Sequence, residues 1–339
     1  MPLHAALHLI GQGRSLTSDQ TADAFAVIMR GDATPTLIGG LLLGLRARGE
    51  TADEVAGAAR AMRAAMVAVR PATGRVLVDT CGTGGGTVST FNISTAAALV
   101  AAAAGAGVPK HGNRSYTSKC GSADVLEALG VNILLDAEPA AAVLNQVGMV
   151  FLFAPTFHPA MRHVGPTRKE LGVATIMNLL GPLTNPAGVE RQVIGVADRS
   201  RAPLMAQALL RLGATRALVV HGEVGMDEVS PVGVTAVWEV ADGAVRTWTL
   251  DPGDYDLKWD RLEDLAGGAP TENAVRIERL LNGEKDEVGR RAVLLNAAAA
   301  LYVSGLAPDY AGAVELARSS LASGAAARAL GDLRAAAPR

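Results

Sequence analysis

The chain is poor in cysteine, in aromatic residues and in excess charge of either sign. Its 339 residues include two cysteines, Cys81 and Cys120, whose spacing fits neither a disulfide framework nor a zinc site. Such sparse cysteine is typical of a reducing compartment, so we predict a cytoplasmic protein. The net charge of −2 gives no general attraction to nucleic acid, and 4% aromatic residues offer few stacking platforms. We therefore expect no nucleic-acid partner.

Long apolar runs are also missing. No run reaches the length of a membrane span without a charge or a glycine, and the N-terminus lacks a basic segment followed by a hydrophobic one. We expect neither a membrane partner nor a signal peptide. What is present is 49% hydrophobic residues and a mean hydropathy of +0.24, enough for a substantial core. The length suits one large domain and a smaller one.

The most informative segment is a glycine loop between an apolar run at 76–78 and an alanine-rich run near 95–104. Four glycines lie between residues 82 and 86. A glycine loop between a strand and a helix lets backbone N–H groups surround an anion, which the helix N-terminus also favours. Side-chain donors follow at Thr90, Asn92, Ser94 and Thr95. The segment predicts a phosphate or diphosphate site, although neither the P-loop pattern nor the dinucleotide fingerprint fits it.

A second polar loop, residues 110–124, follows the predicted strand 107–110. It holds three cations, several hydroxyls and two glycines, and it precedes a predicted helix at 122–129 with Ser122 as its N-cap. Cations would meet phosphates, while hydroxyls and amides would orient a sugar. Loops at the same ends of parallel strands share one crevice, so we expect the two loops to bind one ligand.

Together these segments resemble the anthranilate phosphoribosyltransferases of tryptophan biosynthesis. The resemblance begins with Gly82-Thr-Gly-Gly85 and Thr90-Phe-Asn-Ile-Ser-Thr95, and it covers essentially the whole chain. Further matching motifs are Lys110-His-Gly-Asn-Arg114, Gly121-Ser-Ala-Asp124, His158-Pro-Ala-Met-Arg162, Arg168-Lys-Glu-Leu-Gly172, the segment 178–186, His221-Gly222, Asp227-Glu228, Thr271-Glu-Asn-Ala274 and the segment 295–301. The implied reaction transfers the phosphoribosyl group of phosphoribosyl pyrophosphate (PRPP) to the amine of anthranilate and releases pyrophosphate.

The pattern along the chain predicts an α/β protein with a small N-terminal helical domain. Helices alone are expected up to about residue 70, with N-caps at Thr17, Thr34 and Thr51. Strands and helices alternate afterwards, which favours a mostly parallel central sheet flanked by helices. Strands are expected at 75–79, 107–110, 149–154, 191–196 and 216–221, and helices at 95–104, 122–129, 137–147, 158–171, 200–212, 272–282, 287–303 and 309–323.

Two further expectations concern the end of the sheet and the end of the chain. Asp242-Gly243 between two alternating runs predicts a β-hairpin. The alanine-rich segment 324–339 is expected to fray. The resemblance implies a fold like that of the class II nucleoside phosphorylases, with domains at 1–70, completed by helices near 158–185, and at 71–339. It also implies a homodimer formed through the helical domain, for which exposed Leu37, Leu41, Leu42 or Leu45 would be suitable, and it leaves open a contact with anthranilate synthase.

The resemblance also implies the roles of individual residues. PRPP would be bound by Gly82, Gly85, Gly86, Thr90, Asn92, Ile93, Ser94, Thr95, Lys110, His111, Gly112, Asn113, Arg114, Ser115, Tyr116, Thr117, Ser118 and Ser122. Anthranilate would be met by Gly82, His111, Asn113, His158 and Arg168, and the catalytic residues would be Lys110, Asn113 and Arg168. Mg²⁺ would be held by Ser94, Asp227 and Glu228, since adjacent carboxylates suit a hard cation.

Alternatives stay open at this point. Asp227-Glu228 taken alone fits a solvated acidic turn, Arg168 could pair on an exposed helix face, and the histidines could be structural. Gly86 stands where the family usually carries aspartate, Thr87 where another glycine is usual, and Ala174 where arginine is frequent. The alternative functions are a pyrimidine nucleoside phosphorylase and a non-catalytic relative that binds nucleic acid.

Overall fold

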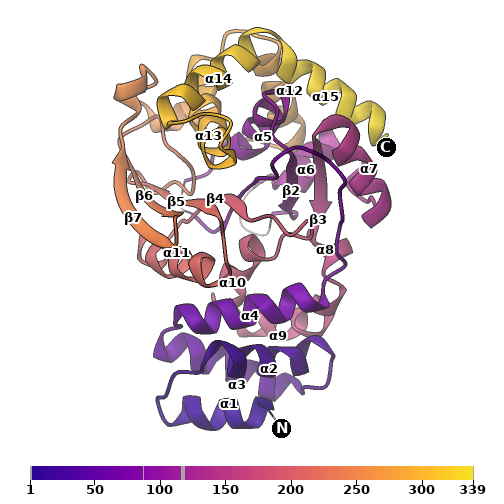
Figure 1. The fold of residues 1–339 in the computed structure, drawn as a ribbon, viewed down its shortest axis with the longest axis vertical. Coiled ribbons are helices and arrows are strands. Elements are labelled where there is room, and N and C mark those ends of the chain that lie inside the picture. The colour runs from indigo at the N-terminus through magenta and orange to yellow at the C-terminus, as the bar shows by residue number, and fades with distance from the viewer. Residues whose placement is uncertain (1, 87, 116–118, 339) are drawn as a thin grey trace.

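The computed structural model describes residues 2–86, 88–115 and 119–338, and it separates a helical bundle from an α/β body (Figure 1). The bundle contains α1 (Pro2–Gly11), α2 (Ser18–Met29), α3 (Pro35–Arg48) and α4 (Ala52–Ala65). The strands are β1 (Asp79–Gly82), β2 (Val108–Gly112), β3 (Met149–Phe153), β4 (Arg191–Gly195), β5 (Arg216–Gly222), β6 (Thr235–Ala241) and β7 (Ala244–Leu250).

The remaining helices follow and separate these strands. They are α5 (Ile93–Ala103), α6 (Ser122–Ala128), α7 (Ala137–Val147), α8 (Ala154–Phe157), α9 (Gly165–Leu171), α10 (Met177–Leu180), α11 (Ala202–Arg211), α12 (Pro270–Leu281), α13 (Glu287–Ser304), α14 (Tyr310–Ala322) and α15 (Ala325–Ala336). Short 3₁₀ turns are η1 (Pro159–His163), η2 (Gly181–Leu183), η3 (Arg199–Arg201), η4 (Pro252–Tyr255) and η5 (Leu262–Leu265).

The bundle helices begin where the sequence predicts. Thr17 and Thr51 each form a capping box, with Gln20 and Glu54 respectively, and Thr34 caps α3. Each box satisfies two backbone N–H groups that the first helical turn leaves without partners, which fixes the start of the helix.

The central sheet has the strand order β1-β4-β5-β6-β7, and β2 and β3 form a second, two-stranded sheet. The pairs β1–β4, β4–β5 and β2–β3 are parallel, whereas β5–β6 and β6–β7 are antiparallel. The predicted hairpin is confirmed: Asp242 and Gly243 both have positive φ, at 52° and 71°, between the paired residues Ala241 and Ala244. Two such residues form the turn that matches the twist of antiparallel strands.

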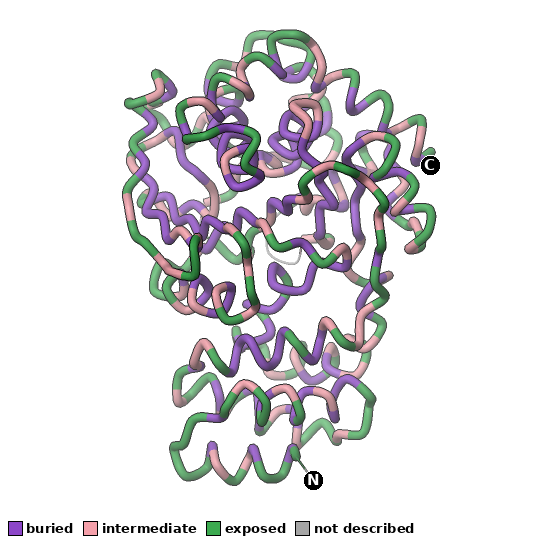
Figure 2. The backbone as a smooth tube through the Cα atoms, in the orientation of Figure 1, coloured by how far each residue is buried: buried purple, intermediate pink, exposed green. Residues whose placement is uncertain are grey.

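Residues on the two faces of the central sheet enter different cores. Val193 and Leu218 pack with α5 and α13, the two helices that are mainly buried in Figure 2. Their neighbours Ile194 and Val219 pack instead with α11 and the bundle helices. This alternation follows from the two-residue period of a strand. The bundle core therefore continues into the lower face of the sheet.

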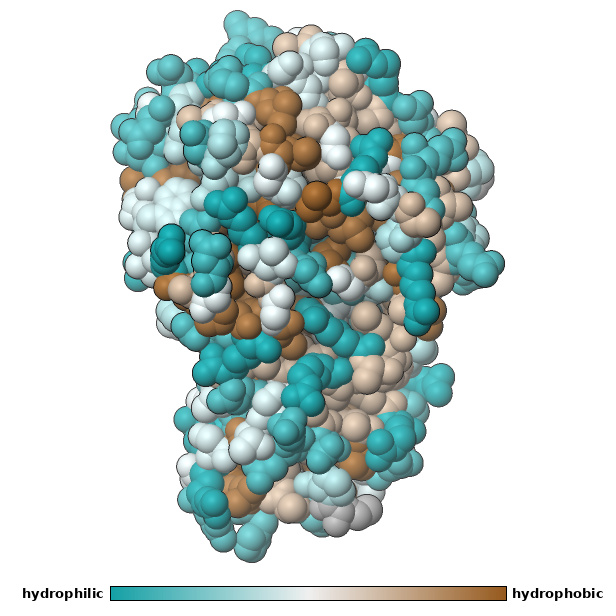
Figure 3. Space-filling model, viewed as in Figure 1, coloured by the Kyte–Doolittle hydropathy of each residue, from teal (hydrophilic) through white to brown (hydrophobic). Residues whose placement is uncertain are grey.

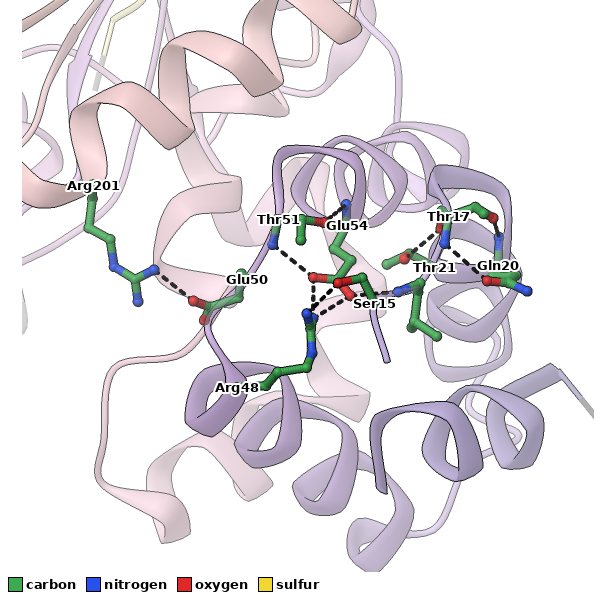
Figure 4. A network of polar contacts seen from close by, with 10 residues as sticks. Ser15, Thr17, Gln20, Thr21, Arg48, Glu50, Thr51, Glu54 and Arg201 are labelled. Atoms are coloured by element: carbon green, nitrogen blue, oxygen red, sulfur yellow. Dashed lines mark hydrogen bonds and ion pairs between the residues drawn. The ribbon is translucent and has the colours of Figure 1, made fainter. Parts of the chain in front are cut away.

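Ion pairs fasten the bundle to the α/β body (Figure 4). Glu50, between α3 and α4, lies 2.6 Å from the Arg201 guanidinium, and Asp53 lies 2.6 Å from Arg211. Inside the bundle the fully buried Glu54 pairs with Arg48 and accepts a hydrogen bond from the Leu16 backbone N–H at 2.8 Å. The helices α9 and α10 also contact α3 and α4 respectively.

Several sequence predictions differ from the structure. The first strand is Asp79–Gly82 rather than 75–79, because the apolar run before it forms only an isolated bridge, Leu77 to Gly107, and Val76 is exposed. The helix expected at 158–171 is divided into η1 and α9, since Gly165-Pro166 restarts the chain. The cap of α6 is Gly121, one residue before Ser122, and the Asp124 carboxylate accepts from its N–H.

The C-terminal segment and the leucines of α3 also differ from expectation. Residues 325–336 form α15, which does not fray because Leu330 and Leu333 are buried in the core. Leu41, Leu42 and Leu45 are fully buried within the chain, whereas Leu43 is 48% exposed. Among the described residues, no helix is both long and apolar enough to cross a membrane. Hydrophobic residues on the face shown in Figure 3 form scattered patches among hydrophilic ones.

Candidate active site

The carboxyl ends of β1, β4 and β5 point to one edge of the central sheet, as parallel pairing requires. A cavity of about 60 Å³ opens there. Its lining comes from segments that are far apart in the sequence: Thr80, Cys81, Gly82, Ser94, Gly195, Asp227, Glu228 and Asn296, with Ala97, Val193 and Val220. The site therefore lies where open α/β sheets bind ligands, and it brings the glycine loop and the acidic pair together.

Asp227 and Glu228 face the glycine loop. The Asp227 carboxylate accepts a hydrogen bond from the Gly84 N–H at 3.2 Å, and Glu228 accepts one from the Thr90 hydroxyl at 3.0 Å. Burial raises the pKa of Asp227 above its ordinary value. Burial, and then the neighbouring Asp227, raise the pKa of Glu228 to about 8. The protein therefore compensates the charged forms of these two carboxyls poorly.

Backbone crowding at the acidic pair explains the need for two glycines. A Cβ on Gly82 would lie 2.6 Å from the Asp227 carboxylate oxygen. On Gly195, at the end of β4, it would lie 1.5 Å from the Asp227 carbonyl oxygen. Gly86 is different, because a Cβ there would lie 3.8 Å from the Asp227 carboxylate in ordinary van der Waals contact. The backbone therefore has room for a Cβ at position 86 and does not require glycine there.

Lys110 lies beneath the loop rather than on its surface. It is 1% exposed, and its ammonium group donates to the Thr80 carbonyl oxygen and, at 3.2 Å, to the Ser94 hydroxyl. Burial lowers the pKa of Lys110, and the Asp79 and Glu228 carboxylates oppose that change. Burial raises the pKa of Asp79, which Lys110 opposes. Lys110 is therefore a buried counter-charge that also positions Ser94.

The remaining predicted residues of the first loop have different surroundings. The Thr95 hydroxyl is buried and, among the described residues, has no hydrogen-bond partner, so its donor is unused. The Ile93 side chain is fully buried in the core, which leaves its backbone for any ligand contact. The φ of Gly85 is 80°, a conformation in the left-handed region that favours glycine.

Arg114, a cation of the second loop, is already paired with carboxylates. Arg114 lies 2.8 Å from the Asp124 carboxylate and 2.5 Å from that of Glu127. The Asn113 side chain accepts from the Arg114 N–H at 2.7 Å, and Ser122 donates to the Asn113 carbonyl oxygen at 3.4 Å. Tyr116, Thr117 and Ser118, also predicted to bind PRPP, lie outside the described residues, as does Thr87.

Close approaches also shape this loop around Gly112, Ser115 and Ser122. A Cβ on Gly112 would lie 2.3 Å from the Ser122 hydroxyl. The Ser115 N–H donates to the Asp124 carboxylate at 3.3 Å.

Two predicted histidines form a buried pair. The ring centroids of His111 and His158 are 5.0 Å apart, and His111 Nδ1 lies 3.2 Å from the Gly181 carbonyl oxygen. Burial lowers the pKa of His111 to about 3 and that of His158 to about 4, so both rings are neutral at pH 7. Within the described part of the chain, both Nε2 atoms are buried without a hydrogen-bond partner. The pair can therefore accept hydrogen bonds but is a poor general base.

Arg168 lies in the last turn of α9, where it is partly buried, on the segment that follows His158 and η1.

Two residues that hold this site together, Asn185 and Asn296, were not predicted from the sequence to belong to it. Asn185 donates from Nδ2 to the Asp79 carboxylate at 2.8 Å and to the Pro109 carbonyl oxygen at 2.7 Å. Asn296 of α13 both donates to and accepts from the backbone of Val229, next to the acidic pair. Asp79 and Asn296 each adjoin an apolar run, and that pattern could have identified them from the sequence.

Models of known protein families match both parts of this architecture. Residues 5–66 match the model of the glycosyl transferase family, helical bundle domain, and residues 74–327 match that of the glycosyl transferase family, a/b domain. The chain is 50% identical over 329 residues to the anthranilate phosphoribosyltransferase of Afipia carboxidovorans, covering 97% of both chains. It is 51% identical over 314 residues to anthranilate phosphoribosyltransferase 2 of Streptomyces coelicolor, covering 93% of both.

Solved structures agree with these relatives. Anthranilate phosphoribosyltransferase from Thermus thermophilus superimposes with a TM-score of 0.91 at 46% identity, covering 97% of this chain and 99% of that one. The enzyme from Saccharomyces cerevisiae in complex with PRPP and Mg gives 0.88 at 30% identity, covering 98% and 97%. The same yeast enzyme has also been solved in complex with 4-fluoroanthranilate.

Proposed function

Because the chain belongs to the anthranilate phosphoribosyltransferase family, and transfers the phosphoribosyl group of PRPP to anthranilate in tryptophan biosynthesis, we propose how its residues share that reaction. The observation that carries the proposal is the meeting of the glycine loop with the uncompensated pair Asp227 and Glu228. A diphosphate with its Mg²⁺ supplies what each part lacks: an anion for the backbone N–H groups and a cation for the carboxylates.

The described residues fit Mg²⁺, which is the cofactor of this family. Burial raises the pKa of both Asp227 and Glu228, and a bound cation would stabilise their charged forms. Mg²⁺ is usually bound by one or two carboxylates together with phosphate oxygens and water, and we propose that PRPP oxygens and water complete the coordination here. Ser94, Asp227 and Glu228 would hold the ion, which when bound neutralises charge on the departing pyrophosphate.

PRPP would lie across the two loops. The N–H groups of the glycine loop and the unused Thr95 hydroxyl face the diphosphate, with Asn92 and Thr90 beside them. Lys110 acts from below by holding Ser94 and by offsetting the charge of Glu228. In the second loop we assign contacts with the ribose and its phosphate to His111, Gly112, Asn113, Ser115 and Ser122, whereas the Arg114 guanidinium stays with its acidic partners Asp124 and Glu127.

Anthranilate would enter beside the two histidines. An arylamine is unprotonated at neutral pH, so its lone pair can attack C1′ while the bond from C1′ to the pyrophosphate oxygen breaks. The nitrogen then loses one proton to water, which gives the neutral secondary amine. The neutral His111 and His158 rings are suited to accept the amine N–H groups and so direct that lone pair. We assign Arg168 to the anthranilate carboxylate, because a guanidinium binds a carboxylate through two parallel hydrogen bonds.

Arg168→Ala tests this assignment. We expect the KM for anthranilate to rise about tenfold with a nearly unchanged KM for PRPP, since a charge-assisted hydrogen bond is lost. Steady-state kinetics with each substrate varied in turn give both constants, and Lys169→Ala, an exposed neighbour on α9, is the matched control. Equal changes in the two KM values would reject the assignment.

The proposal extends to location and assembly. We propose a cytoplasmic enzyme, supported by its low cysteine content, with domains at 1–70, completed by helices near 158–185, and at 71–339. We also propose a homodimer through the bundle, where the exposed Leu43 offers an apolar contact. Light scattering of the wild type and of Leu43→Glu tests the dimer, and co-elution with anthranilate synthase tests that further contact.

The function itself is tested by following anthranilate fluorescence while pyrophosphate is measured. Equal amounts of anthranilate lost and pyrophosphate released, both requiring PRPP, are the expected result. Phosphorolysis of thymidine without this reaction would favour the nucleoside phosphorylase instead, and salt-dependent binding of nucleic acid without either reaction would favour the non-catalytic relative.

A further inference from the structure

The two phosphate loops are connected by hydrogen bonds that converge on the Asn92 side chain. Its Nδ2 donates to the Cys120 carbonyl oxygen at 3.2 Å. Its Oδ1 accepts from the Cys120 thiol at 3.2 Å and from Asn273 Nδ2 at 2.9 Å. One side chain at the start of α5 therefore joins the glycine-loop segment, the second loop and α12.

Asn273 has a fixed orientation in this connection. It is 3% exposed, and its Oδ1 accepts from the Gly268 N–H at 2.8 Å. A backbone N–H requires an acceptor, so the oxygen of the amide must face Gly268 and the NH₂ group must face Asn92. The direction of the whole chain of hydrogen bonds is set by that one contact.

The segment before Asn273 also lies against the loop. The Phe91 N–H donates to the Leu265 carbonyl oxygen at 3.0 Å, and a Cβ on Gly267 would lie 2.4 Å from the Thr90 carbonyl oxygen. The Arg276 guanidinium lies 4.2 Å from the centre of the Phe91 ring. Residues 265–276 thus form a support behind residues 90–92, and Asn273 extends that support to the second loop.

We propose that Asn273 is a positioning residue for PRPP: it holds Asn92 and thereby fixes the two phosphate loops relative to each other. This inference depends on the proposed assignment of both loops to PRPP. Asn273 acts through Asn92 and touches no reacting atom. Its loss should therefore weaken PRPP binding while anthranilate binding is retained.

Two substitutions separate this role from simple support of α12. Asn273→Ala removes both hydrogen bonds and leaves Asn92 Oδ1 and the Gly268 N–H without those partners. Asn273→Asp keeps the acceptor for Gly268 but places an oxygen against Asn92 Oδ1. Each should raise the KM for PRPP about tenfold, the effect of leaving a buried polar group unpaired, with less than about a twofold change for anthranilate.

Ser320→Ala is the matched control. Ser320 is 6% exposed and donates to the Val100 carbonyl oxygen at 3.0 Å, so its loss removes a buried hydrogen bond from the far half of the same helix, α5. We expect it to lower the melting temperature without changing either KM.

Thiol reactivity gives a second readout that needs no turnover. Cys120 is 8% exposed and is held by Asn92, so its alkylation by iodoacetamide, located by peptide mass mapping, should be slow. It should accelerate in both Asn273 variants but not in Ser320→Ala. In the wild type, PRPP should slow the alkylation of Cys120 further. This measurement tests the connection between the two loops even if neither variant folds.

The experiment measures both KM values and the Cys120 alkylation rate in the four proteins. If both Asn273 variants turn over at the wild-type rate with an unchanged KM for PRPP, the positioning role is overturned. A normal KM for PRPP in Asn273→Asp alone would also overturn it. In the wild type, alkylation of Cys120 that ignores PRPP would also overturn it. Absence of wild-type turnover with PRPP would instead reject the proposed function.

Discussion

The two loops at the carboxyl edge of the sheets differ in how their charges are compensated. The glycine loop has no charged side chain and faces two carboxylates whose pKa values are raised. In the second loop, Arg114 is paired with Asp124 and Glu127, and Lys110 is buried near Asp79. The uncompensated charge of the site is therefore negative, even though the second loop carries three cations. To compensate its negative charge, the site requires a bound cation before it requires a phosphate.

The buried cation of the second loop should show the largest effect. Lys110→Met leaves Asp79 buried without its counter-charge, so we expect a loss of about 3–5 kcal/mol in the free energy of unfolding. Urea denaturation measures it. Asp79→Asn combined with Lys110→Met should recover part of the loss, because the neutral pair has no unpaired charge. A double variant no more stable than Lys110→Met would show that the charge is not the cause.

The acidic pair should dominate catalysis. Asp227→Asn combined with Glu228→Gln removes the carboxylates for the cation, and we expect a loss of at least about a hundredfold in kcat/KM. The same change should leave the protein folded, since it removes two poorly compensated buried charges. Activity assays over a range of Mg²⁺ concentrations check the first statement and thermal melts the second. If the double variant has wild-type kinetics, Asp227 and Glu228 have a structural role and not a catalytic one.

The histidine pair predicts a dependence of stability on pH. The ordinary pKa of 6.5 applies to the unfolded chain, whereas that of folded His158 is about 4. As the pH falls from 6.5 towards 4, the unfolded state binds a proton that the folded state does not, so the free energy of unfolding decreases. Between pH 7 and pH 5, the free energy of unfolding should fall by about 2 kcal/mol less in His158→Asn than in the wild type. Urea denaturation at both pH values measures this, and the exposed His8→Asn should behave as the wild type does.

Arg114 should give the smallest effect. Its guanidinium is committed to Asp124 and Glu127, and its side chain is 46% exposed. We expect Arg114→Ala to change the KM for PRPP by less than about threefold, because exposed ion pairs contribute little. A tenfold increase would mean that Arg114 leaves its acidic partners for a phosphate, and the comparison between the loops would then need revision.

Local signals allowed much of the fold to be predicted from the sequence. Capping boxes, the hairpin at Asp242-Gly243 and the alternation of strands and helices depend on neighbouring residues, and the structure confirms them. The start of β1 and the order of α15 depend on distant partners, namely β4 and the core around Leu330. The conformational preferences of neighbouring residues do not reveal such contacts with distant partners.

The site shows the same division. The glycine loop and the acidic pair were recognisable as motifs, and the structure brings them to one cavity. That Lys110 points beneath the loop, and that Asn273 reaches Asn92 across 181 positions, follows only from the fold. The sequence shows that such polar residues are present, but it does not tell which partner each one finds in the fold.

The most direct test of this account is a calorimetric titration of the wild-type protein with PRPP, with and without Mg²⁺. If the uncompensated charge is the acidic pair, PRPP should bind strongly with Mg²⁺ and at least about tenfold more weakly without it. Asp227→Asn combined with Glu228→Gln should lose most of that difference. Equal PRPP affinity with and without Mg²⁺ in the wild type would contradict the account, because the cations of the second loop would then be sufficient.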